Sequence, residues 1–385
     1  MRLLITALLL TLGFNRSLLA AENSPPKTEA GLPDGLYAEF TTARGTFIAE
    51  LFADKVPMTV TNFVGLTEGT LSSKQGQPYY TGLTWYRVIP GFVVQSGNPN
   101  HPEEGTARYT FPDEFCPGLR HGEVGILSMA NAGPDTNGTE FFITLGDDSR
   151  LNYLHSVFGR VVRGLEFLPQ IKPDDAFSLK ILRLGSAAKA FTADDNHFKL
   201  LVAQARTYHG ETEPGPSAHF ADPENQLPTN PPRAAGSNYK LNNFERATGV
   251  KIVTRLFKNA PPANEDTVPG AFMHALAEKS GVARRGALVA YFAADDDWRV
   301  WIGDDSTSAF LGRTATAEDL VKDGALHRGK ETLLNGSRAA GDAAFLAQQK
   351  AAPPNNPPEP AQHLKLQTDA LLDALIFKLE PAAKK

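Results

Sequence analysis

The sequence contains a single cysteine, Cys116, among its 385 residues. One thiol cannot form a disulfide within the chain, and it has no second thiol to share a metal site with. Neither sign of charge is in large excess, since 38 basic and 43 acidic residues leave a net charge of -5. Composition therefore gives no indication of a nucleic-acid partner, and we expect none. We expect Cys116 to be a small buried apolar residue.

Long apolar runs are missing as well. The apolar run near the N-terminus spans residues 3–14, which is shorter than the roughly 20 residues that cross a bilayer. We therefore expect no stable membrane insertion. Arg2 before this run, with Ala20 and Ala21 after it, is the pattern of a cleaved secretory signal over residues 1–21. We expect an exported protein, periplasmic or secreted; the alternative is that the run forms an N-terminal helix of the folded domain.

The length of the chain favours two domains rather than one. After a polar spacer at residues 22–34, residues 35–185 contain short apolar runs separated by turn residues. These runs predict strands at residues 36–41, 46–52, 83–89, 92–95, 126–129, 141–145, 157–162 and 178–184. Strands of this length and frequency favour a closed antiparallel β-barrel. Pro57 and Gly69 delimit a predicted capping helix at residues 57–68.

Residues 186–236 are predicted to leave that domain through a helix and a proline-rich linker. The helical pattern covers residues 194–208, and six prolines with few apolar residues follow over residues 211–236. Such a composition buries too little apolar surface to offset the entropy lost on ordering.

Residues 237–350 change to helical segments that alternate with apolar strands, which predicts an α/β layered domain. Strands are expected at residues 250–257, 287–293 and 298–302, and helices at residues 241–248, 269–280, 317–323 and 330–350. Residues 351–385 hold a second proline-rich break and an amphipathic helix with Leu364, Leu371 and Leu375 on one face. We expect this helix to dock on the second domain; a partner or a membrane surface is the alternative.

The most informative segment is residues 85–97, which read Trp-Tyr-Arg-Val-Ile-Pro-Gly-Phe-Val-Val-Gln-Ser-Gly. Arg87 stands among strand-forming apolar residues, and Phe92 and Gln95 follow a few positions later. A guanidinium is permanently charged and rich in hydrogen-bond donors. Beside an apolar wall it can bond a twisted amide, whose nitrogen has regained its lone pair. That is the chemistry needed for rotation about a prolyl peptide bond.

Residues 85–97 resemble the cyclophilin family of peptidyl-prolyl isomerases, as do the stretches at 45–66, 125–133, 137–143 and 151–160. The resemblance covers about residues 35–185 and implies that Arg87 is the catalytic arginine. It gives the other catalytic positions as Phe92, Gln95, Asn131, Phe142 and His155. It places the substrate pocket at Val93, Gly105, Ala130, Ala132 and Leu151, with Glu140 and Arg150 beside it. The family needs no cofactor, and its substrates are proline-containing polypeptides.

These residues also have simpler interpretations. Phe92 and Phe142 would pack a proline ring, although aromatic residues of strands commonly belong to the core. Gln95 would bond the substrate backbone or orient Arg87. Asn131 would anchor the peptide through its backbone groups or serve only as a turn residue.

Three positions depart from the family pattern. Val93 stands where many members have methionine, which shrinks one side of the pocket with little chemical change. Glu140 replaces a common glutamine, and its carboxylate would favour basic substrates or pair with Arg87. Arg150 replaces the tryptophan that many eukaryotic members use to hold cyclosporin. We therefore expect isomerase activity with weak cyclosporin binding.

Residues 238–350 show a weaker resemblance to the TPM-domain family of small exported αβα domains. It is carried by residues 244–253, 286–291 and 298–300. Some members of that family resemble phosphatases and others are assembly factors, so the resemblance leaves the activity of this domain open. The nearby acidic residues would hold a divalent cation or form a solvated turn; they are Asp295, Asp296, Asp297, Asp304 and Asp305.

The sequence thus predicts an exported two-domain enzyme that isomerises Xaa-Pro bonds in exported or unfolded polypeptides. One alternative is a proline-peptide binding chaperone or scaffold with little turnover. Another is a phosphatase activity of the second domain, which the first domain assists.

Overall fold

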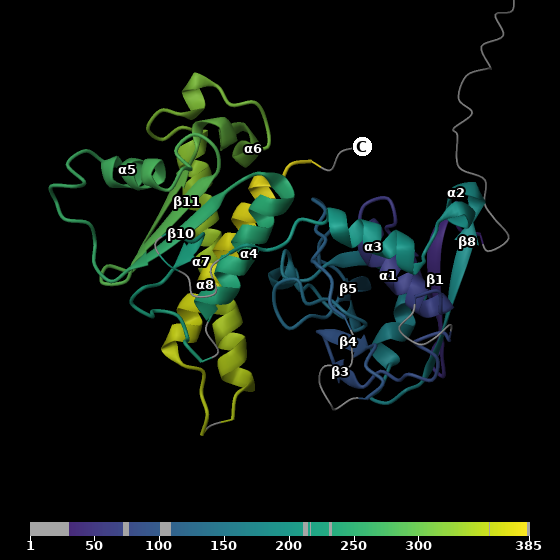
Figure 1. Ribbon diagram of the computed structural model, residues 1–385. Coiled ribbons are helices and arrows are strands. Elements are labelled where there is room, and N and C mark those ends of the chain that lie inside the picture. Colours follow the sequence, from purple (N-terminus) through teal and green to yellow (C-terminus); the bar gives the residue numbers. More distant parts are fainter. Residues whose placement is uncertain are drawn as a thin grey trace, which may run out of the picture.

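The computed structural model describes residues 31–71, 77–100, 109–210, 215, 217–230, 233–353 and 355–382. The predicted signal peptide, most of the predicted spacer and Gly105 lie outside these residues. Figure 1 shows a β-rich N-terminal part in purple to teal, and a C-terminal part of helices and strands in green to yellow. These parts are called the first and second domains below. A β-rich domain followed along the chain by an α/β domain is the order that the sequence predicts.

Antiparallel strands form the sheet of the first domain. Within its described residues they are β1 (Gly35–Thr42), β2 (Gly45–Leu51), β3 (Arg87–Ile89), β4 (Val93–Ser96), β5 (Ile126–Met129), β6 (Phe141–Thr144), β7 (Val157–Arg163) and β8 (Phe177–Leu184). Their order across the sheet is β3-β4-β6-β5-β7-β2-β1-β8. The strands arise from short β-branched and aromatic runs broken by glycine-bearing turns, as the sequence predicted.

The sheet curls until its two end strands approach each other. An isolated bridge joins Thr84, just before β3, to Ala176, just before β8. Backbone hydrogen bonds join Trp85 to Asp174 at 3.0 Å and to Asp175 at 3.1 Å. Within the described residues, the contact between the two ends of the sheet is thus a bridge rather than a ladder. The prediction of an antiparallel sheet is confirmed, in the form of a curled half-barrel.

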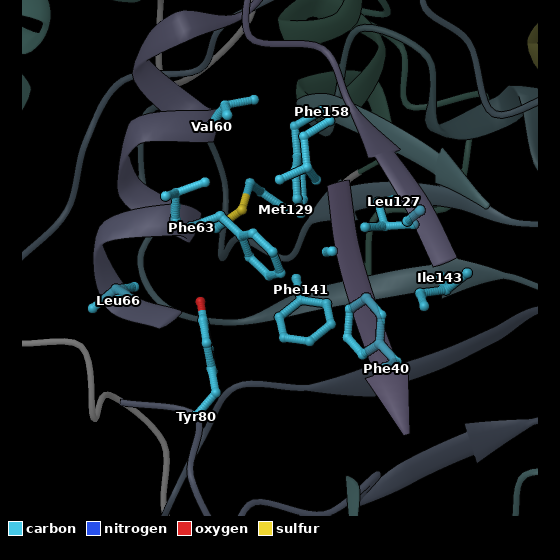
Figure 2. Close-up of a cluster of buried hydrophobic side chains, with 14 of the residues drawn as sticks. Phe40, Val60, Phe63, Leu66, Tyr80, Leu127, Met129, Phe141, Ile143 and Phe158 are labelled. Atoms are coloured by element: carbon cyan, nitrogen blue, oxygen red, sulfur yellow. The ribbon is translucent and has the colours of Figure 1, made fainter. Parts of the chain in front are cut away.

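The inner face of this sheet packs against helix α1 (Pro57–Glu68). Figure 2 shows Phe40 and Phe141 of the sheet beside Phe63 of the helix. The ring centroids of Phe40 and Phe63 lie 6.1 and 5.3 Å from that of Phe141, and all three side chains are 0% exposed. Burial of each such side chain stabilises the fold by roughly 1.5–3 kcal/mol. Cys116 lies at the edge of this core and is half-buried, not fully buried as expected.

Helix α1 has the predicted bounds for identifiable reasons. Pro57 occupies its first turn, and Gly69 ends it with a left-handed φ of 74°. No side chain of the N-cap residue bonds the first turn. Instead, the carboxylate of Glu114 accepts hydrogen bonds from the backbone N–H of Met58 at 3.1 Å and of Thr59 at 2.8 Å. Glu114 thereby supplies the missing cap and ties the helix to the loop before β5.

Two helices lead out of the first domain, α2 (Gly185–Ala190) and α3 (Asp195–Gln204). The carboxylate of Asp194 accepts a hydrogen bond from the backbone N–H of His197 at 2.9 Å and so caps α3. The helix predicted over residues 194–208 is confirmed, although it ends at Gln204.

The second domain is a layered α/β unit. Its described strands are β9 (Phe220–Ala221), β10 (Ile252–Phe257), β11 (Ala287–Phe292) and β12 (Asp297–Ile302), in the order β12-β11-β10-β9. Strands β9, β10 and β11 run parallel to one another, and β12 is antiparallel to β11. Helix α5 (Ala271–Lys279) covers one face of the sheet, while α4 (Arg233–Thr248), α7 (Ala325–Ala351) and α8 (Pro360–Leu379) cover the other (Figure 1). A short helix, α6 (Thr307–Leu311), lies beside α8.

The predicted linker is too long at its C-terminal end. Strand β9 and the start of α4 both fall within residues 211–236. Phe220 is 0% exposed and Leu227 is 2% exposed. The carboxylate of Asp222 orders the following turn by accepting backbone hydrogen bonds from Gln226 and Leu227. A strand of two residues needs little apolar sequence when β10 supplies the neighbouring edge, so the composition of a long window hid it.

The C-terminal helix docks as predicted. Leu371, Leu375 and Leu379 of α8 are at most 2% exposed and belong to the core that α8 shares with the sheet. Its opposite face carries Phe377, which is 65% exposed. Among the residues that the structure describes, no helix combines the length and apolarity needed to cross a bilayer.

The acidic turn before β12 is engaged in ion pairs. Asp296 pairs with Arg338 at 2.5 Å, and Asp297 pairs with Arg299 at 2.7 Å. Within the described ranges, no three His, Cys, Asp or Glu side chains gather in a way that could hold a metal ion. These contacts favour the structural interpretation of the turn.

Candidate active site

Three predicted site residues, Arg87, Gln95 and Phe142, form a row across neighbouring strands of the sheet, and Ser128 continues it. Arg87 of β3 is opposite Gln95 of β4, which is opposite Phe142 of β6, which is opposite Ser128 of β5. Directly opposed residues in antiparallel strands point to the same face. Because the alternate residues Val94 and Ile143 are core members, this row lies on the outer face of the sheet.

Gln95 orients Arg87. The Nη1 of Arg87 donates to Oε1 of Gln95 at 2.9 Å. The Nε2 of Gln95 in turn donates to the hydroxyl of Tyr86 at 2.7 Å and to Oε2 of Glu140 at 3.0 Å. The arginine side chain is exposed, and among the described residues it has no other hydrogen-bond partner. Its remaining N–H groups therefore face solvent, where a substrate amide can meet them.

Glu140 does not pair with Arg87. Its carboxylate accepts a short hydrogen bond from the hydroxyl of Tyr86 as well as the bond from Gln95. The alternative in which Glu140 and Arg87 form an ion pair is wrong for this structure, because Gln95 stands between them. Burial, followed by the hydrogen bond to Glu140, raises the pKa of Tyr86 far above its usual range, so the phenol stays a donor.

Phe92 lies between two arginines. The guanidinium carbon of Arg87 is 5.6 Å from the centre of the Phe92 ring, and that of Arg150 is 4.5 Å away. Arg150 belongs to the 3₁₀ turn η2 (Ser149–Leu151). Both distances fit cation–π contacts. The half-buried Phe92 thus forms an apolar surface directly beside the donor groups of Arg87.

Phe142 is flanked by two imidazoles. The ring of His155 meets it edge-on at 5.5 Å, and the ring of His121 stacks on it at 5.8 Å. Nδ1 of His155 donates to the carbonyl of Met129 at 3.0 Å. His121 contacts Ser128 Oγ through Nε2 at 2.9 Å. These contacts hold the ring of Phe142 in place at the end of the row nearest to β5.

Asn131 ties two loops together. Its Nδ2 donates to the carbonyl of Leu154 at 2.9 Å and lies 3.4 Å from Oδ1 of Asp113. The side chain is thereby occupied by protein groups, which leaves only backbone groups of Asn131 for a peptide. The backbone N–H of Ala130 donates to the carbonyl of Glu140 at 3.0 Å and joins this loop to the start of β6.

The other predicted pocket positions are Val93, Ala132, Leu151 and Gly105. Val93 precedes Gln95 by two positions on β4 and therefore shares its face; it is 1% exposed. Ala132 follows Asn131 in the exposed loop, and Leu151 ends η2 and is half-buried. Gly105 lies outside the described residues.

Three contributors were not found from the sequence: Tyr86, His121 and Asp113. Tyr86 directly precedes the arginine in the motif, and a tyrosine there was a usable signal. His121 and Asp113 are isolated in sequence, so only their partners in space show their importance.

Burial makes both histidines resist protonation. It lowers the pKa of His155 to about 4 and that of His121 to about 3, against about 6.5 in an unfolded chain. Between these values the unfolded chain binds more protons than the folded protein, so the free energy of unfolding rises with pH. The stability contributed by each neutral imidazole is complete above about pH 6.5 and is lost as the pH falls toward the folded pKa.

Replacing His155 by glutamine should therefore flatten this pH dependence. We expect the slope of unfolding free energy against pH, between about 4.5 and 6, to fall by about 1.1 kcal/mol per pH unit relative to the unsubstituted protein. Urea unfolding at several pH values measures it. Buried carboxyl groups contribute equally to both proteins and cancel in the difference. Equal slopes would show that His155 titrates normally in the folded state.

Known proteins match the first domain. The family model described as cyclophilin type peptidyl-prolyl cis-trans isomerase/CLD matches residues 37–181. A probable peptidyl-prolyl cis-trans isomerase A of Mycobacterium leprae is 44% identical over 131 residues, which are 32% of this chain and 72% of that protein. An isomerase of Schizosaccharomyces pombe is 45% identical over 130 residues, covering 33% of this chain and 79% of its own length.

Solved structures are similar as well. A cyclophilin type peptidyl-prolyl cis-trans isomerase of Cryptosporidium parvum is 30% identical, with a TM-score of 0.34, and the match covers 39% of this chain and 98% of that one. The identity to the M. leprae and S. pombe proteins extends over more than two thirds of each of them. Together with the match at residues 37–181, it shows that this chain belongs to the cyclophilin family of peptidyl-prolyl cis-trans isomerases.

Proposed function

We propose that the first domain catalyses cis-trans isomerisation of Xaa-Pro bonds through the row of Arg87, Gln95 and Phe142, with Phe92 beside it. The observation that carries the proposal is the contact between Arg87 and Gln95 at 2.9 Å, which aims a guanidinium across an apolar surface. Family membership and the shared motifs support it. The substrates are proline-containing polypeptides, exported or unfolded.

The reaction requires no nucleophile and no proton transfer. A peptide bond resists rotation by about 18–20 kcal/mol, because its nitrogen shares a lone pair with the carbonyl. When the amide is twisted, the nitrogen regains that pair and can accept a hydrogen bond from Arg87. Phe92 and Phe142 exclude the water that favours the planar, more polar amide. A site that bonds the twisted form more strongly than the planar forms lowers the barrier.

The curled sheet suits this reaction because it holds the guanidinium of Arg87 and the apolar ring of Phe142 at a fixed spacing. We further propose that the bridge between Thr84 and Ala176 closes the sheet into a barrel. The spacing of Arg87, Gln95 and Phe142 is then set by strand register and not by flexible loops.

An isomerisation assay on the full chain tests the proposal. NMR exchange spectroscopy of a short Ala-Pro peptide measures the rate between its cis and trans forms, which interconvert unaided over tens to hundreds of seconds. We expect exchange accelerated in proportion to protein concentration. Peptide binding without acceleration would instead support the chaperone or scaffold alternative.

We also propose that the protein is exported to the periplasm or secreted. Support comes from the apolar run at residues 3–14 and the small residues Ala20 and Ala21. N-terminal sequencing of the protein recovered from its source cells tests this; an N-terminus near residue 22 is expected, and an intact Met1 would contradict it.

Cyclosporin should bind weakly, with a dissociation constant in the micromolar range or above. Arg150 presents a charged and largely exposed guanidinium, stacked on Phe92, where an apolar indole would bury the ligand. Restoring that indole with Arg150→Trp should tighten binding about 10-fold or more, because burying such an apolar side chain is worth roughly 1.5–3 kcal/mol. Isothermal titration calorimetry measures both proteins. Nanomolar binding by the unsubstituted chain would contradict this prediction.

A further inference from the structure

Figure 1 shows helix α4 on the edge of the second domain that faces the first domain. Its side chains donate hydrogen bonds to Asp113 and Tyr153 of the first domain. Tyr239 and Asn243 are four residues apart on this helix and therefore share a face. Tyr239 is 6% exposed and Asn243 is 0% exposed. Both side chains are buried between the domains, and the hydroxyl of Tyr239 and the Nδ2 of Asn243 each donate a hydrogen bond to the first domain.

Tyr239 holds the loop that contains Asp113. Its hydroxyl donates a short hydrogen bond to Oδ2 of Asp113, which is itself 5% exposed. The same carboxylate accepts from Nδ2 of Asn137 at 2.8 Å and from the backbone N–H of Asp135 at 2.9 Å. Asp113 thus joins the segment before β5 to the loop that follows β5. Tyr239 fixes Asp113 from outside the first domain.

Asn243 holds the segment that contains the predicted site residues Leu151 and His155. Its Nδ2 donates to the carbonyl of Tyr153 at 2.8 Å. The ring of Tyr153 meets that of Phe244 edge-on at 5.2 Å, and its hydroxyl donates to Glu380, just beyond α8. One turn earlier on α4, Nζ of Lys240 donates to the carbonyl of Arg150 at 3.1 Å.

Asn131 bridges the two segments that α4 holds. Its Nδ2 bonds the carbonyl of Leu154, the neighbour of Tyr153, and lies near Oδ1 of Asp113. By contrast, within the described residues the hydrogen bonds and ring contacts of Arg87 are all with the first domain. The second domain therefore bonds the segments on both sides of Asn131, which we expect to anchor the peptide, and among the described residues it makes no direct contact with Arg87.

We propose that Tyr239 and Asn243 are positioning residues that set substrate affinity by fixing the loops around Asn131, and that this is a role of the second domain. The inference rests on the proposed isomerase function of the first domain. It predicts an effect on KM with little change in kcat, since the contact between Arg87 and Gln95 is left intact.

The test uses full-length Tyr239→Phe and Asn243→Ala, with Asn242→Ala as the matched control. Tyr239→Phe removes only the hydroxyl and keeps the ring that packs on Tyr208 at 5.3 Å. Asn242 is the adjacent asparagine of the same helix and is half-buried at the surface. NMR exchange of an Ala-Pro peptide over a range of concentrations gives kcat and KM for each protein.

We expect KM to rise about 3- to 10-fold in Tyr239→Phe and in Asn243→Ala, the range for loss of one hydrogen bond, with kcat within about 2-fold. Asn242→Ala should match the unsubstituted chain in both constants. The side-chain amide resonances of Asn131 should shift in Tyr239→Phe and stay in place in Asn242→Ala. Unchanged KM in Tyr239→Phe, or equal changes in all three variants, would overturn the proposal.

The failure of the proposed function is recognised separately. If the unsubstituted chain does not accelerate exchange, that function is wrong, and the dissociation constant of the same peptide, measured by NMR titration, replaces KM. Weaker binding by Tyr239→Phe and Asn243→Ala than by Asn242→Ala would still support positioning by the second domain. Equal binding by all four proteins would contradict it. Because Tyr239→Phe retains the buried ring, it also decides the matter if Asn243→Ala does not fold.

Discussion

Replacing Arg87 by alanine is expected to lower kcat/KM for an Ala-Pro peptide about 10- to 150-fold. The loss corresponds to roughly 1.5–3 kcal/mol of transition-state stabilisation, the scale of a hydrogen bond from a charged donor. The side chain is exposed and bonds only Gln95 among the described residues, so the free energy of unfolding should change by less than about 0.5 kcal/mol. NMR exchange measures the activity, and urea unfolding measures the stability.

Two further variants make this result specific. Arg160 of β7 is another exposed strand arginine, 3.4 Å from Glu50, and Arg160→Ala should retain full activity. Arg87→Lys keeps the charge but loses the planar fork of donors, and it should fall between the alanine variant and the unsubstituted chain. Full activity in Arg87→Ala would refute the catalytic assignment, whatever the fold of the domain.

Local sequence was sufficient to predict most of the first domain. The short strands follow β-branched and aromatic runs, and α1 begins at Pro57 and ends before Gly69 as predicted. The row of Arg87, Gln95 and Phe142 could be anticipated only through the resemblance to a known family. No periodicity in the sequence states that β4 pairs with both β3 and β6.

The features that sequence analysis missed depend on partners far away in the chain. Tyr239 and Asp113 are 126 positions apart, and the composition of either segment gives no sign of the other. Strand β9 has two residues and exists because β10 offers it an edge. Pairing of Glu140 with Arg87 was one of two alternatives, and it fails because Gln95 bonds both groups at once and its amide occupies the space between them.

The second large effect is expected from substitution of Phe141, whose neighbour Phe142 lies on the opposite face of β6. Phe141 is 0% exposed, and its ring lies 5.3 Å from that of Phe63 and 5.4 Å from that of Tyr80. Replacing it by alanine should lower the free energy of unfolding by about 3–5 kcal/mol, because a large cavity opens where the rings meet. The folded fraction should keep normal kcat/KM, since Arg87 and Phe92 are untouched. Urea unfolding and NMR exchange on the same samples measure both quantities.

Phe142→Ala is the matched control, because it makes the same chemical change one position along the strand. Phe142 contacts the rings of His121 and His155 on the outer face, so its loss should destabilise the fold less than that of Phe141. It should nevertheless lower kcat/KM about 10-fold, since the proline ring loses an apolar wall worth roughly 1.5–3 kcal/mol when fully buried. The two variants thus separate the core of the sheet from its working face. If Phe141→Ala were the more damaging to kcat/KM, or Phe142→Ala the more damaging to stability, the placement of the site on the outer face would be wrong.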